Sequence, residues 1–182
     1  MANRREGKPA LQPIGLTWIA AVLRQGGHEV QIYDMLTEGY YNEVPHPYDP
    51  NFIRYGHGLK ELYRRLDSFK PDIVGVSCIC SLRHFEACDV VRWVKEYDPT
   101  ILTIMGGNHP TTMRKLVLDE CKQNLDFIIA GEGESFMLEV ARNMSWWHHP
   151  RPVDSWKYFG EPGPRNLDNL PPPAHDLLPM DL

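Results

Sequence analysis

Residues 101–111 read ILTIMGGNHPT, and this stretch decides the fold that the sequence predicts. The apolar run shows no in–out alternation, which is typical of a strand covered on both faces in a parallel sheet. Two glycines follow where such a strand would emerge at its carboxyl edge, the edge at which open α/β sheets bind ligands. Gly106 and Gly107 would let a bulky ligand lie against the backbone, or they only form a tight turn.

Outward from this stretch, helix and strand patterns alternate along the chain with short joints. Apolar residues at three-and-four spacing predict helices over residues 13–25, 59–66, 85–94, 113–121 and 136–144, the last capped by Ser135. Short apolar runs predict further strands over residues 30–35, 72–80 and 126–130. This alternation predicts an α/β fold with a parallel sheet and helices on both of its faces.

The composition changes near residue 150, because eight of the 16 prolines lie between Pro150 and Pro179. We therefore expect two parts, a folded domain over residues 1–149 and a proline-rich strap or linker over residues 150–182.

Composition excludes several classes of protein. The chain has 182 residues, 42% of them hydrophobic, which is enough for one core of ordinary size. A net charge of -5 without a Lys/Arg block argues against a nucleic-acid partner. No segment approaches the roughly 18 apolar residues of a membrane span, and the start, MANRREGKPA, has no signal-peptide core. Four cysteines in such a chain predict free thiols and a cytoplasmic location.

Three turns should meet at one edge of the predicted sheet. They are Ser77-Cys78, residues 106–111 and residues 131–134, and each follows a buried strand. Their small residues would leave a trough in which backbone N–H groups can bind amide or phosphate oxygens. The Gly-x-Gly of residues 131–133 lacks a third glycine, and Glu132 and Glu134 would repel a pyrophosphate, so a dinucleotide is disfavoured.

Five segments in sequence carry a specific resemblance: PIGLTWIAAVLRQGGHEVQIYD, PDIVGVSC, ILTIMGGNHPT, DFIIAGEGES and LDNLPPPAHDLLP. Together they resemble the cobalamin-binding domain at the front of cobalamin-dependent radical S-adenosylmethionine enzymes. That group includes the anaerobic magnesium-protoporphyrin IX monomethyl ester cyclase and several methyltransferases. The resemblance implies a Rossmann-like (flavodoxin-like) sheet that holds the corrin ring across its carboxyl edge.

Matched position by position, the resemblance assigns cofactor-binding residues but no catalytic residue and no metal ligand. The cofactor-binding set is Ser77, Gly106, Gly107, His109, Pro110, Gly131, Glu132 and Gly133. His109 either reaches toward the ligand or hydrogen-bonds its own turn. The resemblance implies cobalt without a protein histidine beneath it, as is usual in this family. Residues 34–39 are similar to an Asp-x-His-x-x-Gly loop with Leu36 in place of histidine, but they follow the second strand of the family pattern, so we treat the match as coincidence.

Other candidate sites are weaker. Cys78 and Cys80 alternate on a predicted strand and would either bind a metal together or be buried small residues. Trp146, Trp147, His148 and His149 read as a metal or stacking site, or as an aromatic helix end.

The sequence departs from the family pattern in two places. Relatives open with an apolar strand, which residues 1–12 do not contain, and a strand order of 2-1-3-4-5 would make that missing first strand central. The Cys-x-x-x-Cys-x-x-Cys motif of the radical domain is also absent. The [4Fe-4S] cluster and S-adenosylmethionine would then belong to a separate domain, in cis or in trans, and this chain alone would be inactive. The alternatives are a non-catalytic remnant or interaction module with the same fold, and a nucleotide-binding Rossmann protein.

Overall fold

A parallel four-stranded sheet forms the centre of the computed structural model, which describes residues 12–45, 51–121, 123–144, 158–161 and 167–179. The strands run in the order β3-β4-β5-β6, with bounds Ile73–Ser77, Leu102–Gly106, Phe127–Gly131 and Tyr158–Glu161. Residues 102–105 of β4 and 127–130 of β5 are all buried. The predicted parallel sheet is confirmed, because each pair of neighbouring strands is parallel, and the apolar runs of β4 and β5 are covered on both faces.

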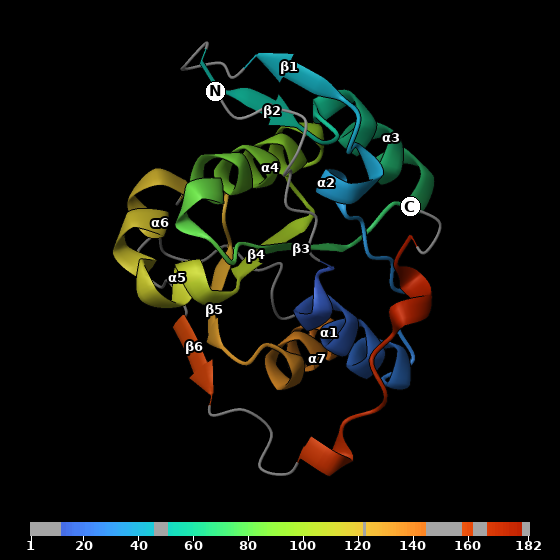
Figure 1. Ribbon diagram of the computed structural model, residues 1–182. Helices are drawn as coiled ribbons and strands as arrows, with labels where there is room; N and C mark the ends of the chain where they lie inside the picture. The colour runs from blue at the N-terminus through green and yellow to red at the C-terminus, as the bar shows by residue number, and fades with distance from the viewer. Residues whose placement is uncertain (1–11, 46–50, 122, 145–157, 162–166, 180–182) are drawn as a thin grey trace.

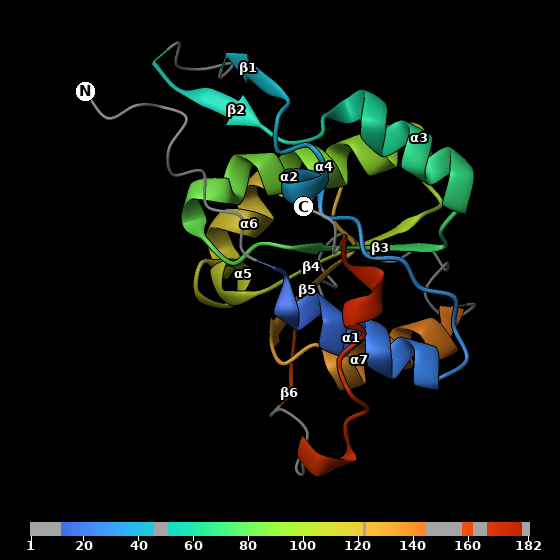
Figure 2. The same ribbon diagram turned by 45° about the vertical axis from the view of Figure 1, so that its right-hand side comes forward.

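Helices cover the two faces of the sheet (Figures 1 and 2). On one face lie α3 (Leu59–Phe69), α4 (His84–Tyr97) and α6 (Arg114–Cys121); on the other lie α1 (Ile14–Gln25) and α7 (Glu134–Arg142). Side chains of the strands alternate between these layers. Met105 and Ile128 share a cluster with Val91 of α4 and Val117 of α6, whereas Ile104, Ile129, Leu23, Phe136 and Val140 form the core beneath α1 and α7. The predicted α/β architecture with helices on both faces is confirmed.

The strand predicted over residues 30–35 does not form. Residues 28–34 carry no regular structure, and Met35–Glu38 is a short helix, α2, whose N-cap Asp34 accepts hydrogen bonds from the N–H groups of Leu36 and Thr37 at 3.1 Å. Ile32 is nevertheless buried against α1, so this apolar residue of the segment does face the core. The physical reason is that a strand needs a backbone partner, and the described residues place no strand between this segment and β3.

β3 lies at the edge of the described sheet, in agreement with the predicted lack of a first strand. Gly75 and Ser77 of β3 are exposed, although the equivalent stretch of β4 is buried. A separate antiparallel ribbon, β1 (Glu43–Pro45) with β2 (Ile53–Tyr55), was not predicted.

The proline-rich tail packs against the domain in two places. β6 pairs parallel with β5 and becomes the fourth strand, and the last described residues return to α1 (Figure 1). The Ala174 N–H donates to the Thr17 carbonyl at 3.0 Å, Arg24 pairs with Asp176 at 2.7 Å, and Leu178 is buried beside Ala174. The tail also holds the single-turn helices η2 (Leu167–Asn169) and η3 (His175–Leu177). The division at residue 149 stays a prediction, and the cluster at residues 146–149 lies outside the described residues.

No helix among the described residues combines the length and apolarity that a membrane crossing requires.

Candidate functional site at the carboxyl edge of the sheet

The three predicted turns meet at the carboxyl edge of β3, β4 and β5. Ser77 is in register with Gly106, and the Cys78 N–H donates to the Gly106 carbonyl at 2.9 Å. The Thr111 hydroxyl joins the second and third turns, because it donates to the Gly107 carbonyl at 2.8 Å and accepts from the Gly131 N–H at 3.1 Å. The prediction that these turns share one edge is therefore confirmed.

Gly106 and Gly107 have different structural roles. Gly107 has φ +106° and ψ -178°, a conformation almost restricted to glycine, and an added Cβ would lie 2.7 Å from the Cys78 carbonyl oxygen. A Cβ on Gly106 would meet nothing closer than Ile129 at 3.8 Å, an ordinary contact. The turn itself therefore requires glycine only at position 107, whereas position 106 could accept a Cβ in ordinary contact with Ile129.

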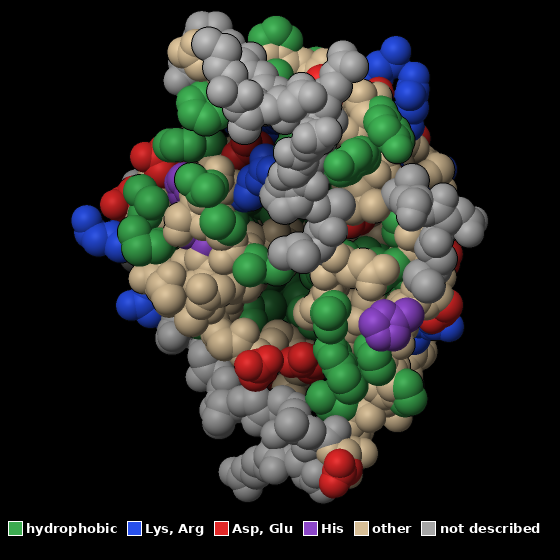
Figure 3. Space-filling view, viewed as in Figure 1, with side chains coloured by type: hydrophobic (Ala, Val, Ile, Leu, Met, Phe, Trp, Pro, Cys, Tyr) green, Lys and Arg blue, Asp and Glu red, His purple; other side chains and the backbone are tan. Residues whose placement is uncertain are grey.

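The surface around these turns is hollowed. Figure 3 shows the hollow among the positions that the ends of β3 and β5 and the start of α1 occupy in Figure 1. Ser77, Asn108, Gly131 and Glu132 are exposed at this edge. The edge thus offers a broad recess with small side chains and backbone groups on its rim.

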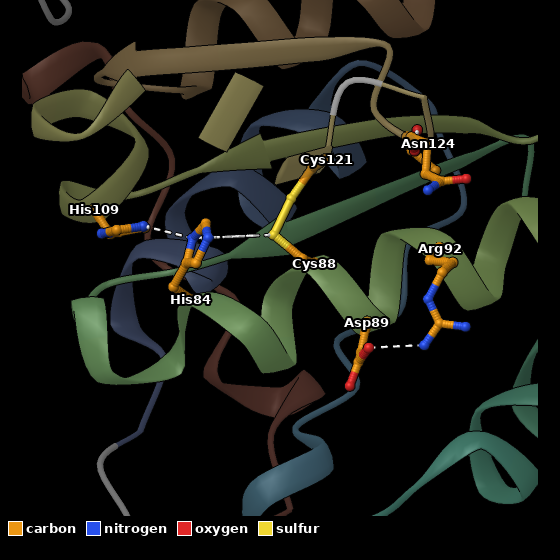
Figure 4. Close-up of a disulfide and its surroundings, with 8 residues drawn as sticks. His84, Cys88, Asp89, Arg92, His109, Cys121 and Asn124 are labelled. Carbon is orange, nitrogen blue, oxygen red and sulfur yellow. Dashed lines mark hydrogen bonds and ion pairs between the residues drawn. A yellow bond between two sulfur atoms is a disulfide. The ribbon is translucent and has the colours of Figure 1, made fainter. Parts of the chain in front are cut away.

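His109 and Pro110, which were assigned to the cofactor, are both buried. His109 is 1% exposed, and its Nε2 lies 2.9 Å from His84 Nδ1 (Figure 4). Its Nδ1 lies 2.9 Å from Ser81 Oγ. Its side chain therefore bonds the neighbouring turn and α4, which is neither of the two predicted alternatives. The sequence could not reveal this pair, because His84 and His109 are 25 residues apart.

Burial favours the uncharged form of the His84 imidazole near neutral pH. His84 is buried, and burial together with the adjacent His109 lowers the pKa of its imidazole, against a weaker raising effect of Glu120. A neutral imidazole has one N–H donor and one acceptor nitrogen, so each ring can donate on one side and accept on the other.

Glu134 is a candidate site residue that the sequence did not indicate. It begins α7 in the Gly-Glu-Gly-Glu turn, is 8% exposed, and its Oε2 has no hydrogen-bond partner in the described structure. A buried carboxylate oxygen without a donor is costly, which is the arrangement expected where a ligand supplies the donor. The sequence signal that could have indicated this residue is the second glutamate of the Gly-Glu-Gly-Glu turn.

The prediction that Ser135 caps α7 is wrong, because Gly133 occupies the N-cap position.

The cysteines differ from the prediction of free thiols. Cys88 of α4 and Cys121 of α6 form a disulfide, shown in Figure 4, so the prediction is wrong for this pair. Cys78 and Cys80 are free; Cys78 is buried, which raises the pKa of its thiol to about 11, and Cys80 is exposed. The described residues contain no group of three or more candidate metal ligands.

A second depression, of about 420 Å³, lies at the opposite edge of the sheet, before β3 and β4 begin. Its walls are the turns that lead into these strands: Lys70, Pro71, Asp72, Tyr97, Asp98, Thr100 and Ile101. It is remote from the carboxyl ends of the strands, where α/β sheets bind their ligands.

Comparison with known proteins agrees with this geometry. The family model of the B12 binding domain matches residues 4–141, so the chain belongs to the B12-binding domain family. This match confirms the resemblance on which the sequence analysis relied. No solved structure matches the chain.

Similar proteins of known name are methyltransferases and a cyclase. The chain is 38% identical over 126 residues to the cytidylyl-2-hydroxyethylphosphonate methyltransferase of Streptomyces wedmorensis, covering 69% of this chain and 23% of that protein. It is 29% identical over 175 residues to the hopanoid C-3 methylase of Methylococcus capsulatus, covering 92% and 30%. It is 30% identical over 129 residues to the anaerobic magnesium-protoporphyrin IX monomethyl ester cyclase of Rubrivivax gelatinosus, covering 70% and 20%. The chain thus spans between a fifth and a third of the length of these relatives.

Proposed function

We propose that this chain holds cobalamin across the three turns at the carboxyl edge of its sheet and presents it to a separate catalytic domain. The observation that carries the proposal is the hollow where three small-residue turns meet at one edge of the sheet (Figure 3), in a chain of the B12-binding family. Cobalamin is bulky and carries one phosphate, so it suits a wide recess without a basic pocket.

The residues present fit such a ligand. Ser77, Gly106, Gly131 and Glu132 would line the recess, and the lack of bulky side chains at the first three would let the ligand lie against the backbone. The buried Glu134 Oε2 has no partner, and it would accept a hydrogen bond from an amide N–H of the corrin side chains. Cobalamin supplies a cobalt centre that carries a methyl group or supports radical chemistry.

The other assigned residues would act on the shape of the recess. Gly107 and Gly133 allow the close turns, and a Cβ on Gly133 would lie 3.1 Å from Ile19 Cδ1. The buried side chains of His109 and Pro110 belong to the second turn and would support it from inside, His109 through Ser81 and His84. We assign no catalytic residue and no metal ligand to the chain.

We further propose that the complete enzyme is a cobalamin-dependent radical S-adenosylmethionine methyltransferase or cyclase. A separate domain, in cis or in trans, would bind the [4Fe-4S] cluster and S-adenosylmethionine, since the chain lacks the three-cysteine motif. The relatives are several times longer than this chain, which supports such a partner domain. Exposed apolar side chains follow β3, namely Ile79 (63%), Leu82 (87%) and Phe85 (62%), and they suit a protein surface placed over the recess.

Cobalamin binding can be tested with two variants at the recess. We expect purified protein mixed with hydroxocobalamin to retain corrin absorbance through gel filtration. Gly106→Val should lose this absorbance while keeping the melting temperature, because its Cβ meets nothing closer than 3.8 Å. Gly58→Ala is the matched control at the N-cap of α3, where the nearest atom is 3.9 Å away.

Glu134→Gln tests the buried carboxylate. Because a hydrogen bond to a charged acceptor is worth about 1.5–3 kcal/mol, we expect cobalamin affinity to fall at least about tenfold. Glu139→Gln, on the exposed side of the same helix, should bind as the unmodified chain does. A colourless protein peak from the unmodified chain, or retention of NAD instead, would contradict the proposed function.

A further inference from the structure

The disulfide encloses the part of the chain that forms the central turn. Cys88 lies on α4 and Cys121 ends α6, 33 residues later, with their Cα atoms 5.6 Å apart. Between the two cysteines run the rest of α4, β4, residues 106–111 with the short helix α5 (Asn108–Thr112), and α6. Whether this bond is present or broken therefore changes the constraint on the turn that borders the recess.

Contacts also connect the disulfide directly to this turn (Figure 4). Cys88 Sγ lies 3.8 Å from His84 Nε2, and His84 Nδ1 lies 2.9 Å from His109 Nε2. The backbone N–H of His109 donates to the Cys78 carbonyl at 3.1 Å, and this bond joins the second turn to the first. An unbroken series of contacts runs from the sulfur atom to the site.

The series responds chemically to the state of the sulfur. In neutral rings, if His109 donates from Nε2 to His84 Nδ1, then His84 donates from Nε2 toward Cys88. A disulfide sulfur is a weak acceptor, whereas a thiolate is a strong one and a thiol can itself donate. Reduction of the bond therefore alters the partner that orients His84, and through it His109.

We propose that Cys88 and Cys121 are a redox-active pair, with a dithiol as the reducing substrate, and that its state controls the order of residues 106–111. The effect on the turn does not depend on the ligand, and only its consequence for cobalamin affinity rests on the proposed function. In the disulfide form the turn is held, and in the dithiol form it is looser and the recess less preorganised.

The exchange begins at Cys88, because Cys121 is 1% exposed and Cys88 is half-buried. A thiolate of the dithiol attacks Cys88 Sγ, the Sγ–Sγ bond breaks, and Cys121 leaves with the electron pair and takes up a proton. The second thiol of the reductant then attacks the mixed disulfide and releases Cys88, which is also protonated. Two electrons pass to the pair, and the dithiol leaves as a cyclic disulfide.

The test compares hydrogen exchange in the ligand-free chain, oxidised and then reduced with dithiothreitol. Thiol titration after denaturation should give two free thiols in the oxidised chain, Cys78 and Cys80, and four after reduction. We expect amides of residues 106–112 to exchange at least about tenfold faster in the reduced form and to recover on reoxidation. Amides of α7 should not respond. Cys80→Ser, which removes an exposed thiol outside the pair, should respond as the unmodified chain does.

His84 is a positioning residue in this scheme and needs its own test. In His84→Phe, reduction should still raise the number of free thiols from two to four. The hydrogen-exchange rates of residues 106–112 should no longer differ between the oxidised and reduced forms. In His84→Gln, part of that difference should return. If a variant does not fold, the comparison of the two states of the unmodified chain still decides.

Equal exchange rates in the two states, or four free thiols after treatment with oxidised glutathione, would overturn the proposal. Cobalamin binding is measured separately on both forms. If neither form binds cobalamin, the proposed function alone is rejected, whereas cobalamin binding with an unresponsive turn would reject this inference alone.

Discussion

At the carboxyl edge of the sheet, some residues are needed for folding and others are better explained by ligand binding. The backbone conformation of residue 107 requires glycine, whereas residue 106 could accept a Cβ in ordinary contact, and Glu134 has a buried oxygen without a donor. A binding site is expected to leave such hydrogen bonds unmet and such small residues beyond the needs of the fold, because the ligand occupies the site.

Alanine at these two glycines should therefore give opposite results for stability. We expect Gly107→Ala to lower the free energy of unfolding by at least about 2 kcal/mol, from the strained backbone and the contact with the Cys78 carbonyl. Gly106→Ala should change it by less than about 1 kcal/mol. Urea unfolding of both variants measures the difference, and equal losses would mean that the turn does not have the described conformation.

The buried His84 predicts a pH dependence of stability. Its pKa is lowered in the folded chain, so the unfolded chain binds the proton more readily. The corresponding stability is fully present above the ordinary histidine pKa of about 6.5 and is lost as the pH falls toward the folded-state value.

Urea midpoints measured between about pH 7.5 and pH 5 test this, with the window set around the reference histidine value. The midpoint of the unmodified chain should fall more steeply with decreasing pH than that of His84→Gln. His175→Gln, at an exposed position, should keep the unmodified slope. The same slope in all three chains would exclude His84 as the cause.

At the scale of elements, local pattern was sufficient wherever a segment supplies its own structure. The amphipathic spacing of Leu59, Leu62 and Leu66 forms α3, and the apolar run before Gly106 forms β4. The sequence pattern did not predict the structure where a neighbouring strand determines whether a segment becomes a strand. Residues 30–35 have the composition of a strand but no strand beside them, and β6 arises in a proline-rich segment because β5 offers an edge.

The candidate site was predictable to the same extent. Turns that follow buried strands reveal their position through glycines, so residues 77, 106–107 and 131–133 could be found from the sequence. The His84–His109 pair and the Cys88–Cys121 bond join residues far apart in the chain, and no spacing rule indicates which of them meet.

The tail is expected to unfold together with the rest of the domain. Leu178 is buried against α1, so Leu178→Ala should lower the free energy of unfolding by about 2–4 kcal/mol in one cooperative transition. Leu177→Ala, at a partly exposed neighbour, should cost about 1 kcal/mol or less. An unchanged midpoint for Leu178→Ala would mean that the tail is a strap independent of the core.

At the scale of the whole molecule, a ligand that spans three turns stabilises all the strands that carry them. Hydroxocobalamin at 100 times its dissociation constant should raise the free energy of unfolding by about 2.7 kcal/mol. Urea unfolding with and without the ligand measures this, and Gly106→Val should show no increase. A stabilisation that persists in Gly106→Val would place the ligand elsewhere on the molecule.

The fourth strand has a practical consequence for anyone who trims this domain. Ending the polypeptide at residue 149, where the composition changes, would remove β6, which pairs with β5. It would also remove Ala174 and Leu178, which pack against α1. β5 would then become an edge strand whose unpaired backbone N–H and C=O groups could pair with other molecules and promote aggregation. The smallest piece that keeps the described fold intact extends to Pro179.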